Sequence, residues 1–400
     1  MILVSPDVIV VGAGPAGAFS AYHAAKLGAE VEVHEEHTES GISPHCTGHV
    51  SLAGLKQLDL KLPRNLVENE IRSAIFHSPS NQHFAVKFSS PVTYVINRER
   101  FDEYLREKAL EAGVRIVYNS HVRSLTAKKD SIIGVAAETR KGVEESRSKV
   151  VINAEGVSSI LLKRAGLPSP NSRLTVKGIE ADVDRIMDIE LDSVEVFLTR
   201  EFAPGLFAWI VPRSDGSAKI GLGTEKGNPV DCLRRFIHKN PIARLRLKGS
   251  HLTRIVCHPI SLGGPISKTF HNGLLIVGDA ASHVKPTTGG GIVMGLMGAK
   301  IAGEVAALSI NKKFELSTYE RLWKKKFGLD MTIMKQLRLL LNRLSDKKLD
   351  HLIDISNRIG LNESLRKMIN IDFQGKSLIR AATDPRVLAK GVYLSVVTLF

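Results

Sequence analysis

The stretch Asp7-Val-Ile-Val-Val-Gly-Ala-Gly-Pro-Ala-Gly17 decides the fold of this 400-residue chain. Its continuous apolar run predicts a strand of a parallel sheet that is buried on both faces. The glycines that follow open a helix that we expect to extend to about Leu27, and residues 30–34 have the composition of a second strand. The stretch therefore predicts a strand–helix–strand unit of the Rossmann type, in the α/β class.

The glycine-rich turn of this unit predicts a dinucleotide site. Gly12, Gly14 and Gly17, with Ala16 among them, leave backbone N–H groups and the positive end of the helix dipole open to a pyrophosphate. Glu35 follows the second strand, where a carboxylate can accept hydrogen bonds from ribose hydroxyls. An acidic residue there disfavours the phosphorylated ribose of NADP, and both NAD and FAD remain open.

The rest of the chain continues the α/β pattern, with one interruption. A helix is expected over residues 101–112, and buried strands are expected over residues 149–153 and 274–277. Residues 171–262 differ, because their alternating apolar and polar runs are typical of an antiparallel sheet. We interpret this segment as an insertion. The final part of the chain has helical periodicity, with Leu337, Leu340, Leu341 and Leu344 expected on one face.

Three separated motifs carry a family resemblance. They are the N-terminal glycine-rich turn, Arg98-Glu-Arg-Phe-Asp102, and Gly278-Asp279-Ala-Ala with the later Gly289-Gly290-Gly291-Ile292. Together they resemble the FAD-dependent oxidoreductases built like p-hydroxybenzoate hydroxylase, and this resemblance implies FAD as the cofactor. It places Asp279 on the ribityl chain and Arg98 near phosphate charge. It also places the glycines and Ile292 where a helix N-terminus approaches the flavin.

A shorter motif is similar to one in the geranylgeranyl reductases, particularly the archaeal enzymes that saturate the isoprenoid chains of ether lipids. Pro44-His-Cys46-Thr-Gly48 resembles their PxCxG motif. The resemblance implies that Cys46 and Gly48 lie at the flavin, and that the thiol of Cys46 is available as a proton donor. A small buried hydrophobic residue is the alternative role for Cys46.

A second motif of the same family is matched less closely. Phe207-Ala-Trp209-Ile-Val-Pro212 resembles YxWxFP, and it implies that Phe207, Trp209 and Pro212 contact the isoprenoid substrate. Aromatic residues that alternate along a strand can equally belong to the core. The chain departs from the family patterns at three positions. Phe207 lacks the hydroxyl of the motif, Val211 stands where the motif has Phe, and Glu155 stands before Gly156 where the wider superfamily has Asp.

The resemblance also implies how the chain is divided. We expect a Rossmann-type FAD-binding domain, an inserted antiparallel-sheet substrate domain, and a basic helical C-terminal region. The expected bounds are residues 1–62, 95–170 and 265–310 for the FAD-binding domain, 63–94 and 171–264 for the substrate domain, and 311–400 for the C-terminal region.

The activity implied by the resemblance is saturation of geranylgeranyl double bonds in membrane ether lipids by hydride transfer from reduced FAD. The partners would be the isoprenoid lipid and an electron donor, for which ferredoxin, deazaflavin and NADPH all remain possible. Two alternatives stay open: a flavin-dependent aromatic hydroxylase or halogenase on the same fold, and a non-catalytic FAD-containing lipid-binding protein.

Charge and composition bear on the remaining partners. The formal net charge is +14, and residues 311–400 hold 18 Lys or Arg against 9 Asp or Glu. We expect this excess to attract an anionic membrane surface, through Lys324, Lys325, Lys326, Lys335, Arg338 and Arg343. Solvated helix faces are the alternative. Nucleic acid is not an expected partner, because it would leave the three flavin motifs unused.

The predicted location is cytoplasmic, with peripheral attachment to a membrane. No basic, cleavable leader pattern precedes the first strand, and we expect no membrane-spanning helix because Lys300 interrupts the apolar stretch 289–299. The three cysteines, Cys46, Cys232 and Cys257, have the spacing of neither a disulfide framework nor a metal site, so reduced thiols and no metal are expected.

Overall fold

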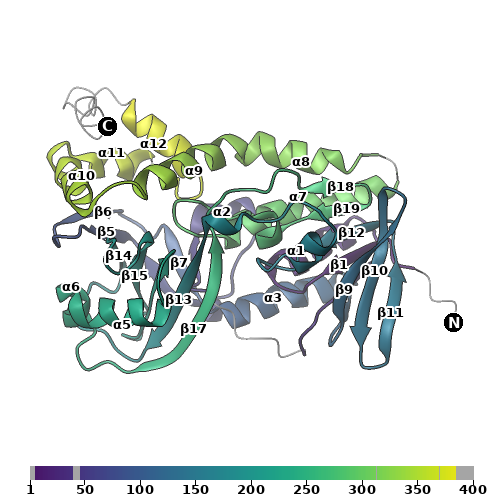
Figure 1. Ribbon diagram of the computed structural model, residues 1–400, viewed down its shortest axis with the longest axis horizontal. Coiled ribbons are helices and arrows are strands. Elements are labelled where there is room, and N and C mark those ends of the chain that lie inside the picture. The colour runs from purple at the N-terminus through teal and green to yellow at the C-terminus, as the bar shows by residue number, and fades with distance from the viewer. Residues whose placement is uncertain (1–4, 39–45, 312, 369, 384–400) are drawn as a thin grey trace. The chain divides into compact units, whose positions relative to one another are not determined.

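The computed structural model describes residues 5–38, 46–311, 313–368 and 370–383 (Figure 1). The chain forms two compact units, each built from three segments. The first comprises Met1–Pro44, Glu99–Leu174 and Ser261–Met331, and the second comprises His45–Arg98, Thr175–Ile260 and Thr332–Phe400. The C-terminal region expected over residues 311–400 is divided: its described part up to Met331 groups with the first unit, and its described part from Thr332 onward groups with the second. Which segments bind cofactor and which bind substrate stays a prediction.

The first unit is centred on a six-stranded sheet with the order β18-β19-β12-β1-β2-β8. Strand β1 (Val8–Val11) pairs in parallel with β12 on one side and with β2 on the other, and all four of its side chains are buried. This confirms the predicted strand–helix–strand unit. The other strands are β2 (Val31–His34), β8 (Arg115–Val117), β12 (Val150–Asn153), β18 (Phe270–His271) and β19 (Leu274–Ile276).

Two glycine-containing helices pack closely in this unit. Helix α1 (Pro15–Lys26) follows β1. Helix α7 (Ile292–Ile310) packs against α1 where Gly303 meets the backbone of Ser20. A Cβ atom on Gly303 would lie 2.2 Å from the carbonyl oxygen of Ser20, so only glycine permits this approach. The remaining helices are α3 (Arg98–Glu111), α4 (Ile160–Arg164), η2 (Ser172–Leu174), η3 (Gly278–Ala281), α8 (Ser317–Trp323) and the π-helix η4 (Lys324–Gly328).

Helix α7 continues for ten residues beyond Lys300, so its apolar character extends past the stretch 289–299. By length and composition α7 alone among the described helices could cross a membrane, and 67% of its most apolar window is buried within the protein. Its glycines and alanines contact α1 and the central sheet. We therefore interpret α7 as a core helix.

A three-stranded antiparallel sheet completes the unit, with β9 (His121–Lys128), β10 (Ser131–Thr139) and β11 (Gly142–Arg147).

The second unit contains the antiparallel sheet that was predicted for the inserted segment. Its seven strands have the order β17-β13-β16-β15-β14-β5-β6, and only the pair β14 and β5 is parallel among the pairs from β13 to β6. The strands are β5 (Ser73–His77), β6 (His83–Lys87), β13 (Thr175–Val183), β14 (Ser193–Phe197), β15 (Gly205–Pro212), β16 (Ala218–Thr224) and β17 (Leu252–Ser261). A smaller sheet contains β3 (His49–Ser51), β4 (Val67–Ile71) and β7 (Thr93–Ile96).

The two faces of the seven-stranded sheet differ. Helix α5 (Pro229–Lys239) and helix α6 (Pro241–Arg246) cover one face, where Ala208, Ile210 and Ile220 point into an apolar core. The opposite face carries the alternate residues of the same strands. Two short elements, α2 (Leu52–Gln57) and η1 (Arg64–Leu66), complete the N-terminal segment of this unit.

The C-terminal helices are α9 (Leu329–Leu341), α10 (Asp346–Arg358), α11 (Leu361–Met368) and α12 (Gln374–Ala382). Of the leucines expected on one face, Leu337, Leu340 and Leu341 lie in α9 and are half-buried, and Leu344 lies beyond the helix and is buried. The most buried side chains of α9 itself are Asp330, Met331, Met334 and Arg338. Arg338 is only 5% exposed, so it cannot contribute to a charged surface as expected. Burial lowers its pKa to about 10.

Three buried histidines in the first unit predict a loss of stability in acid. Burial lowers the pKa of His283 to about 3, and the pKa values of His23 and His34 to about 4. The folded protein therefore keeps these rings neutral while the unfolded chain takes up protons below about pH 6.5, so the free energy of unfolding falls as pH falls. Between about pH 7.5 and about pH 5.5 each ring should remove about 1.4 kcal/mol.

The measurement is urea unfolding at both pH values, with His283→Phe as the matched variant. His283 stacks on Trp323 at 4.4 Å between ring centroids, and phenylalanine keeps a neutral ring there. The variant should lose about 1.4 kcal/mol less than the wild type on acidification. An identical pH dependence in both proteins would contradict the assignment.

Candidate functional site

The glycine-rich loop after β1 is held against the end of β2. The backbone N–H of Gly12 donates to the carbonyl oxygen of His34 at 2.8 Å, and the N–H of Ala13 donates to the Glu35 carboxylate at 2.6 Å. The other oxygen of Glu35 accepts from the backbone N–H of His37 at 3.1 Å. A carboxylate has about four acceptor positions, so Glu35 retains capacity for ribose hydroxyls.

The three glycines of the loop differ in whether the protein structure itself requires glycine at their positions. Gly12 has φ +90°, which favours glycine, and a Cβ on Gly17 would lie 1.8 Å from the carbonyl oxygen of Gly12. Gly14 has an ordinary extended conformation, and a Cβ there would have no atom within 4 Å. Helix α1 begins after Gly14 without a side-chain cap, so its first N–H groups are available to an anion. This open space fits the pyrophosphate of a dinucleotide.

The late glycine motif lies at the same place in the first unit. A Cβ on Gly278 would lie 2.8 Å from the Cβ of Ala16, so the start of η3 touches the first turn of α1. A Cβ on Gly291 would lie 3.2 Å from a carboxylate oxygen of Asp279, which is exposed. The structure therefore brings the N-terminal loop, Asp279 and the glycine triplet together.

The remaining residues of that motif lead into α7. Gly289 has φ +76°, and Gly290 packs against the side chain of Lys285. Gly291 is the N-cap of α7 and Ile292 is its first residue. A second uncapped helix N-terminus thus begins beside Asp279, because no side chain caps α7 either.

Glu155, where the family pattern has Asp, has a local role. Its carboxylate accepts from the backbone N–H groups of Leu161 at 2.8 Å and Leu162 at 3.2 Å, and from the side chain of Asn153 at 2.8 Å. It therefore satisfies the free N–H groups at the start of α4. The longer side chain of Glu performs this function from two residues beyond β12.

The turn around Cys46 belongs to the second unit, while Pro44 and His45 of its motif lie outside the described residues. Gly48 has φ +72°, and a Cβ there would lie 2.2 Å from the carbonyl oxygen of Ile96, so the close approach of β7 requires glycine. Cys46 is a free, half-buried thiol, and its Sγ atom accepts from the N–H of Gly48 at 3.4 Å.

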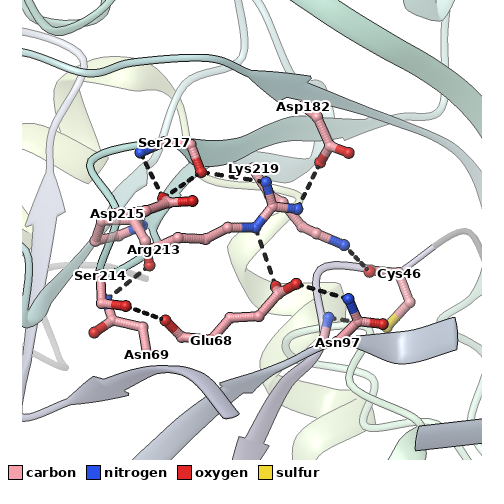
Figure 2. A network of polar contacts seen from close by, with 12 residues as sticks. Cys46, Glu68, Asn69, Asn97, Asp182, Arg213, Ser214, Asp215, Ser217 and Lys219 are labelled. Atoms are coloured by element: carbon pink, nitrogen blue, oxygen red, sulfur yellow. Dashed lines mark hydrogen bonds and ion pairs between the residues drawn. The ribbon is translucent and has the colours of Figure 1, made fainter. Parts of the chain in front are cut away.

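A buried ion pair that the sequence analysis missed holds this turn. The ammonium of Lys219 donates to the carbonyl oxygen of Cys46 at 2.9 Å, as Figure 2 shows. The same ammonium lies 3.7 Å from the carboxylate of Glu180, which accepts from the hydroxyl of Thr47 at 2.5 Å. Both charged side chains are less than 10% exposed, and burial raises the pKa of the Glu180 carboxyl.

A second polar cluster lies next to this pair. The guanidinium of Arg213 contacts Glu68 and Asp182, each at 3.0 Å, and Glu68 also accepts from the side chain of Asn97 at 3.1 Å (Figure 2). Asp182 of β13 lies directly opposite Lys219 of β16 in the strand register, so the two clusters are adjacent. One sequence signal could have revealed them: Lys219, Glu180 and Asp182 are charges within otherwise apolar strands.

Trp209 and Phe207 lie on the same sheet face as this ion pair. Trp209 and Glu180 both pair with Gly221, and a Cβ on Gly221 would lie 2.4 Å from the indole ring. The indole N–H of Trp209 is buried and has no partner among the described residues. Phe207 meets Trp209 edge-on, with 5.9 Å between centroids. The predicted substrate aromatics and Cys46 are thus brought together within the second unit.

Pro212 and Arg98 occupy the ends of elements. Pro212 is the last residue of β15, is buried, and accepts from the side chain of Asn69 at 2.9 Å. This contact involves the backbone carbonyl of Pro212, and the role of Pro212 at the substrate stays a prediction. Arg98 is half-buried and is the first residue of α3.

Within the described part of the chain, no three His, Cys, Asp or Glu side chains are grouped so that they could hold a metal ion.

Comparison with known proteins gives the family. The sequence profile of the family described as FAD binding domain matches residues 5–321, which confirms FAD as the cofactor. Digeranylgeranylglycerophospholipid reductase 2 of Methanothermobacter thermautotrophicus is 34% identical over 359 residues, with 87% of this chain and 90% of the relative covered. The chain belongs to the digeranylgeranylglycerophospholipid reductase family. The reductase 2 of Methanopyrus kandleri is 31% identical, with 88% of this chain and 90% of that relative covered.

A solved structure supports the same placement. The geranylgeranyl bacteriochlorophyll reductase-like protein of Thermoplasma acidophilum matches with a TM-score of 0.85 and 26% sequence identity. The match covers 97% of this chain and 99% of that one. The predicted fold class, an FAD-binding Rossmann-type α/β fold with further sheet and helical regions, is therefore confirmed.

Proposed function

We propose that this chain is a reductase that saturates the double bonds of geranylgeranyl chains on membrane ether lipids. The observation that carries the proposal is the gathering of two of the flavin motifs, the N-terminal glycine-rich turn and the segment of Asp279 with its glycine triplet, around an uncapped helix N-terminus. The chain is also similar over most of its length to named lipid reductases. Gly12, Gly14, Ala16, Gly17 and Glu35 would hold the dinucleotide portion of FAD. Asp279 and residues 289–292 would hold the portion nearer the flavin ring.

Hydrogenation of an alkene needs a hydride for one carbon and a proton for the other. When bound and reduced, FAD supplies the hydride. For the proton we propose the Cys46 thiol, which is half-exposed and lies in a turn fixed by Gly48 and Lys219. The thiolate left behind would regain its proton from solvent.

The apolar substrate needs a wall, and Phe207 with Trp209 would provide it. The two rings pack edge to face on the sheet face that carries the Cys46 turn. Burial of an isoprenoid chain against aromatic rings is favourable through apolar area alone, so no hydroxyl at position 207 is required. Arg98 would contact phosphate charge of the cofactor.

The proposal also includes an electron donor, whose identity is left open, and a location at a membrane surface. A reductase needs a source of electrons, and ferredoxin, deazaflavin and NADPH are all compatible with the chain. Attachment to a membrane surface from the cytoplasmic side would bring the protein to its lipid substrate.

The test is anaerobic oxidation of the reduced flavoprotein by a digeranylgeranyl lipid. Addition of the lipid should restore the absorbance of oxidised flavin without oxygen, because the alkene accepts the electrons. An aromatic hydroxylase or halogenase would instead require oxygen for productive turnover, and a non-catalytic lipid-binding protein would keep its flavin reduced. Either result would contradict the proposal.

A further inference from the structure

An apolar cavity of about 270 Å³ lies in the second unit, beneath helix α5. It belongs to the face of the seven-stranded sheet that α5 covers, and therefore not to the face that carries Trp209 and the Cys46 turn. Its apolar walls come from three elements: Leu233 and Ile237 of α5, Ile179 and Val183 of β13, and Leu252 and Ile255 of β17.

The rim of this cavity exposes large apolar side chains. Leu252 is 43% exposed and Ile255 is 48% exposed, although both line the cavity. Leu245 of α6 is 59% exposed, and Met187, in a loop, is 49% exposed. The backbone N–H of Met187 donates to the carbonyl oxygen of Arg246 at 2.8 Å, so this loop lies at the end of α6. Gathered apolar exposure of this kind marks an interaction surface more often than a plain solvated one.

The apolar rim is surrounded by positive charge. Residues 231–251 contain six Lys or Arg and one Asp. Arg234 and His238 of α5 border the cavity itself. Arg246 is engaged internally with Glu195 and Asp188, whereas the other basic side chains of this stretch are exposed: Arg234, Arg235, Lys239, Arg244 and Lys248.

This combination selects one kind of partner. A nucleic acid would use the cations but not the exposed Leu252, Ile255 and Leu245. An anionic bilayer uses both, because basic side chains attract the lipid headgroups while apolar side chains enter the boundary with the hydrocarbon. The cavity behind the rim can accept part of a hydrocarbon chain, since most of the residues that line it are apolar.

We propose that the cavity rim and α5–α6 form a docking face for an anionic lipid bilayer. The docking face is defined by Arg234, Arg235, Lys239, Leu245, Leu252 and Ile255. It is a different surface from the C-terminal lysine cluster expected from the sequence. In that cluster Arg338 is buried, Lys324 pairs with Glu320 at 2.7 Å, and burial lowers the pKa of Lys326.

The experiment is co-sedimentation of the full-length FAD-loaded protein with vesicles of equal parts phosphatidylglycerol and phosphatidylcholine. Two double variants test the face: Arg235→Glu with Lys239→Glu for charge, and Leu252→Ser with Ile255→Ser for apolar contact. The matched charge control is Lys128→Glu with Lys141→Glu, which reverses two exposed lysines of the first unit. The matched apolar control is Val143→Ser, at a valine that is 71% exposed.

The wild type should sediment with these vesicles and much less with pure phosphatidylcholine, and added salt should weaken the binding. The charge variant should bind at least about tenfold more weakly. The apolar variant should also bind more weakly, and both controls should bind like the wild type. Unchanged binding by both test variants, equal loss in the controls, or no binding by the wild type would overturn the proposal. The last result would favour a protein partner for this face.

FAD content and hydrogenation of detergent-dispersed lipid should be unchanged in every variant, because none of the replaced residues belongs to the proposed catalytic or cofactor site. Loss of vesicle binding with normal turnover in detergent therefore separates this docking face from the reductase activity. The two proposals can fail independently.

Discussion

A chain that carries Gly14→Val should fold normally and purify without FAD. The Cβ atom of the valine would meet no protein atom within 4 Å, and the backbone there has φ −64° and ψ 176°, which valine adopts readily. It would occupy the space that a pyrophosphate needs at the start of α1. The absorbance of cofactor released by heat measures occupancy, which should fall from about one FAD per chain to nearly none.

The neighbouring glycine provides the control. In Gly17→Val the side chain would collide with the carbonyl oxygen of Gly12, because a Cβ there would lie only 1.8 Å away. This variant should lose both its FAD and its thermal stability, whereas Gly14→Val keeps an unfolding temperature close to that of the FAD-free wild type. Stoichiometric FAD in Gly14→Val would contradict the placement of the pyrophosphate.

Replacement of Cys46 by Ala should slow hydrogenation about 100-fold or more and leave FAD content unchanged. This is the usual contribution of a positioned general acid, and the variant removes the thiol that we propose as the proton donor. Single-turnover oxidation of the reduced flavin by the lipid under anaerobic conditions measures the step. The matched control is Cys257→Ala, at an exposed cysteine of β17, which should react at the wild-type rate.

The ion pair beneath the turn offers a milder variant. Lys219→Met removes the donor to the Cys46 carbonyl oxygen but leaves the thiol in place. It should slow the same step less than Cys46→Ala does, since it disturbs the position of the acid rather than removing it. Full activity in Cys46→Ala would reassign Cys46 to packing, and loss of FAD in that variant would make the residue structural.

Local patterns sufficed to predict the first strand and the first helix of the first unit. Strand β1 and helix α1 follow from a continuous apolar run and a glycine-rich turn, both of which are confined to a few neighbouring residues. The gathering of Asp279 with the N-terminal loop was predictable from the family resemblance alone. Sequence periodicity contains no record of a contact between residues that are so distant along the chain.

The parts that sequence analysis missed depend on long-range pairing. Strands β5 and β14 pair in parallel although their paired residues, such as Ser73 and Ser193, are 120 positions apart, and neither strand shows this in its own composition. Lys219 and Glu180 were visible as charges within apolar strands, but their contact with the Cys46 turn depends on the register of β13 with β16. The apolar character of α7 extends beyond Lys300, because a single charged side chain at a half-buried position is accommodated within a core helix.

The most direct test of the central claim is the mass of the lipid product. The purified protein is reduced chemically, mixed anaerobically with a digeranylgeranyl glycerophospholipid, and the extracted lipid is analysed by mass spectrometry. A reductase of this family should add two hydrogen atoms for each double bond, so the product should appear as a series of masses with that spacing. A lipid recovered at its original mass, with the flavin fully reduced before mixing and FAD bound throughout, would contradict the account.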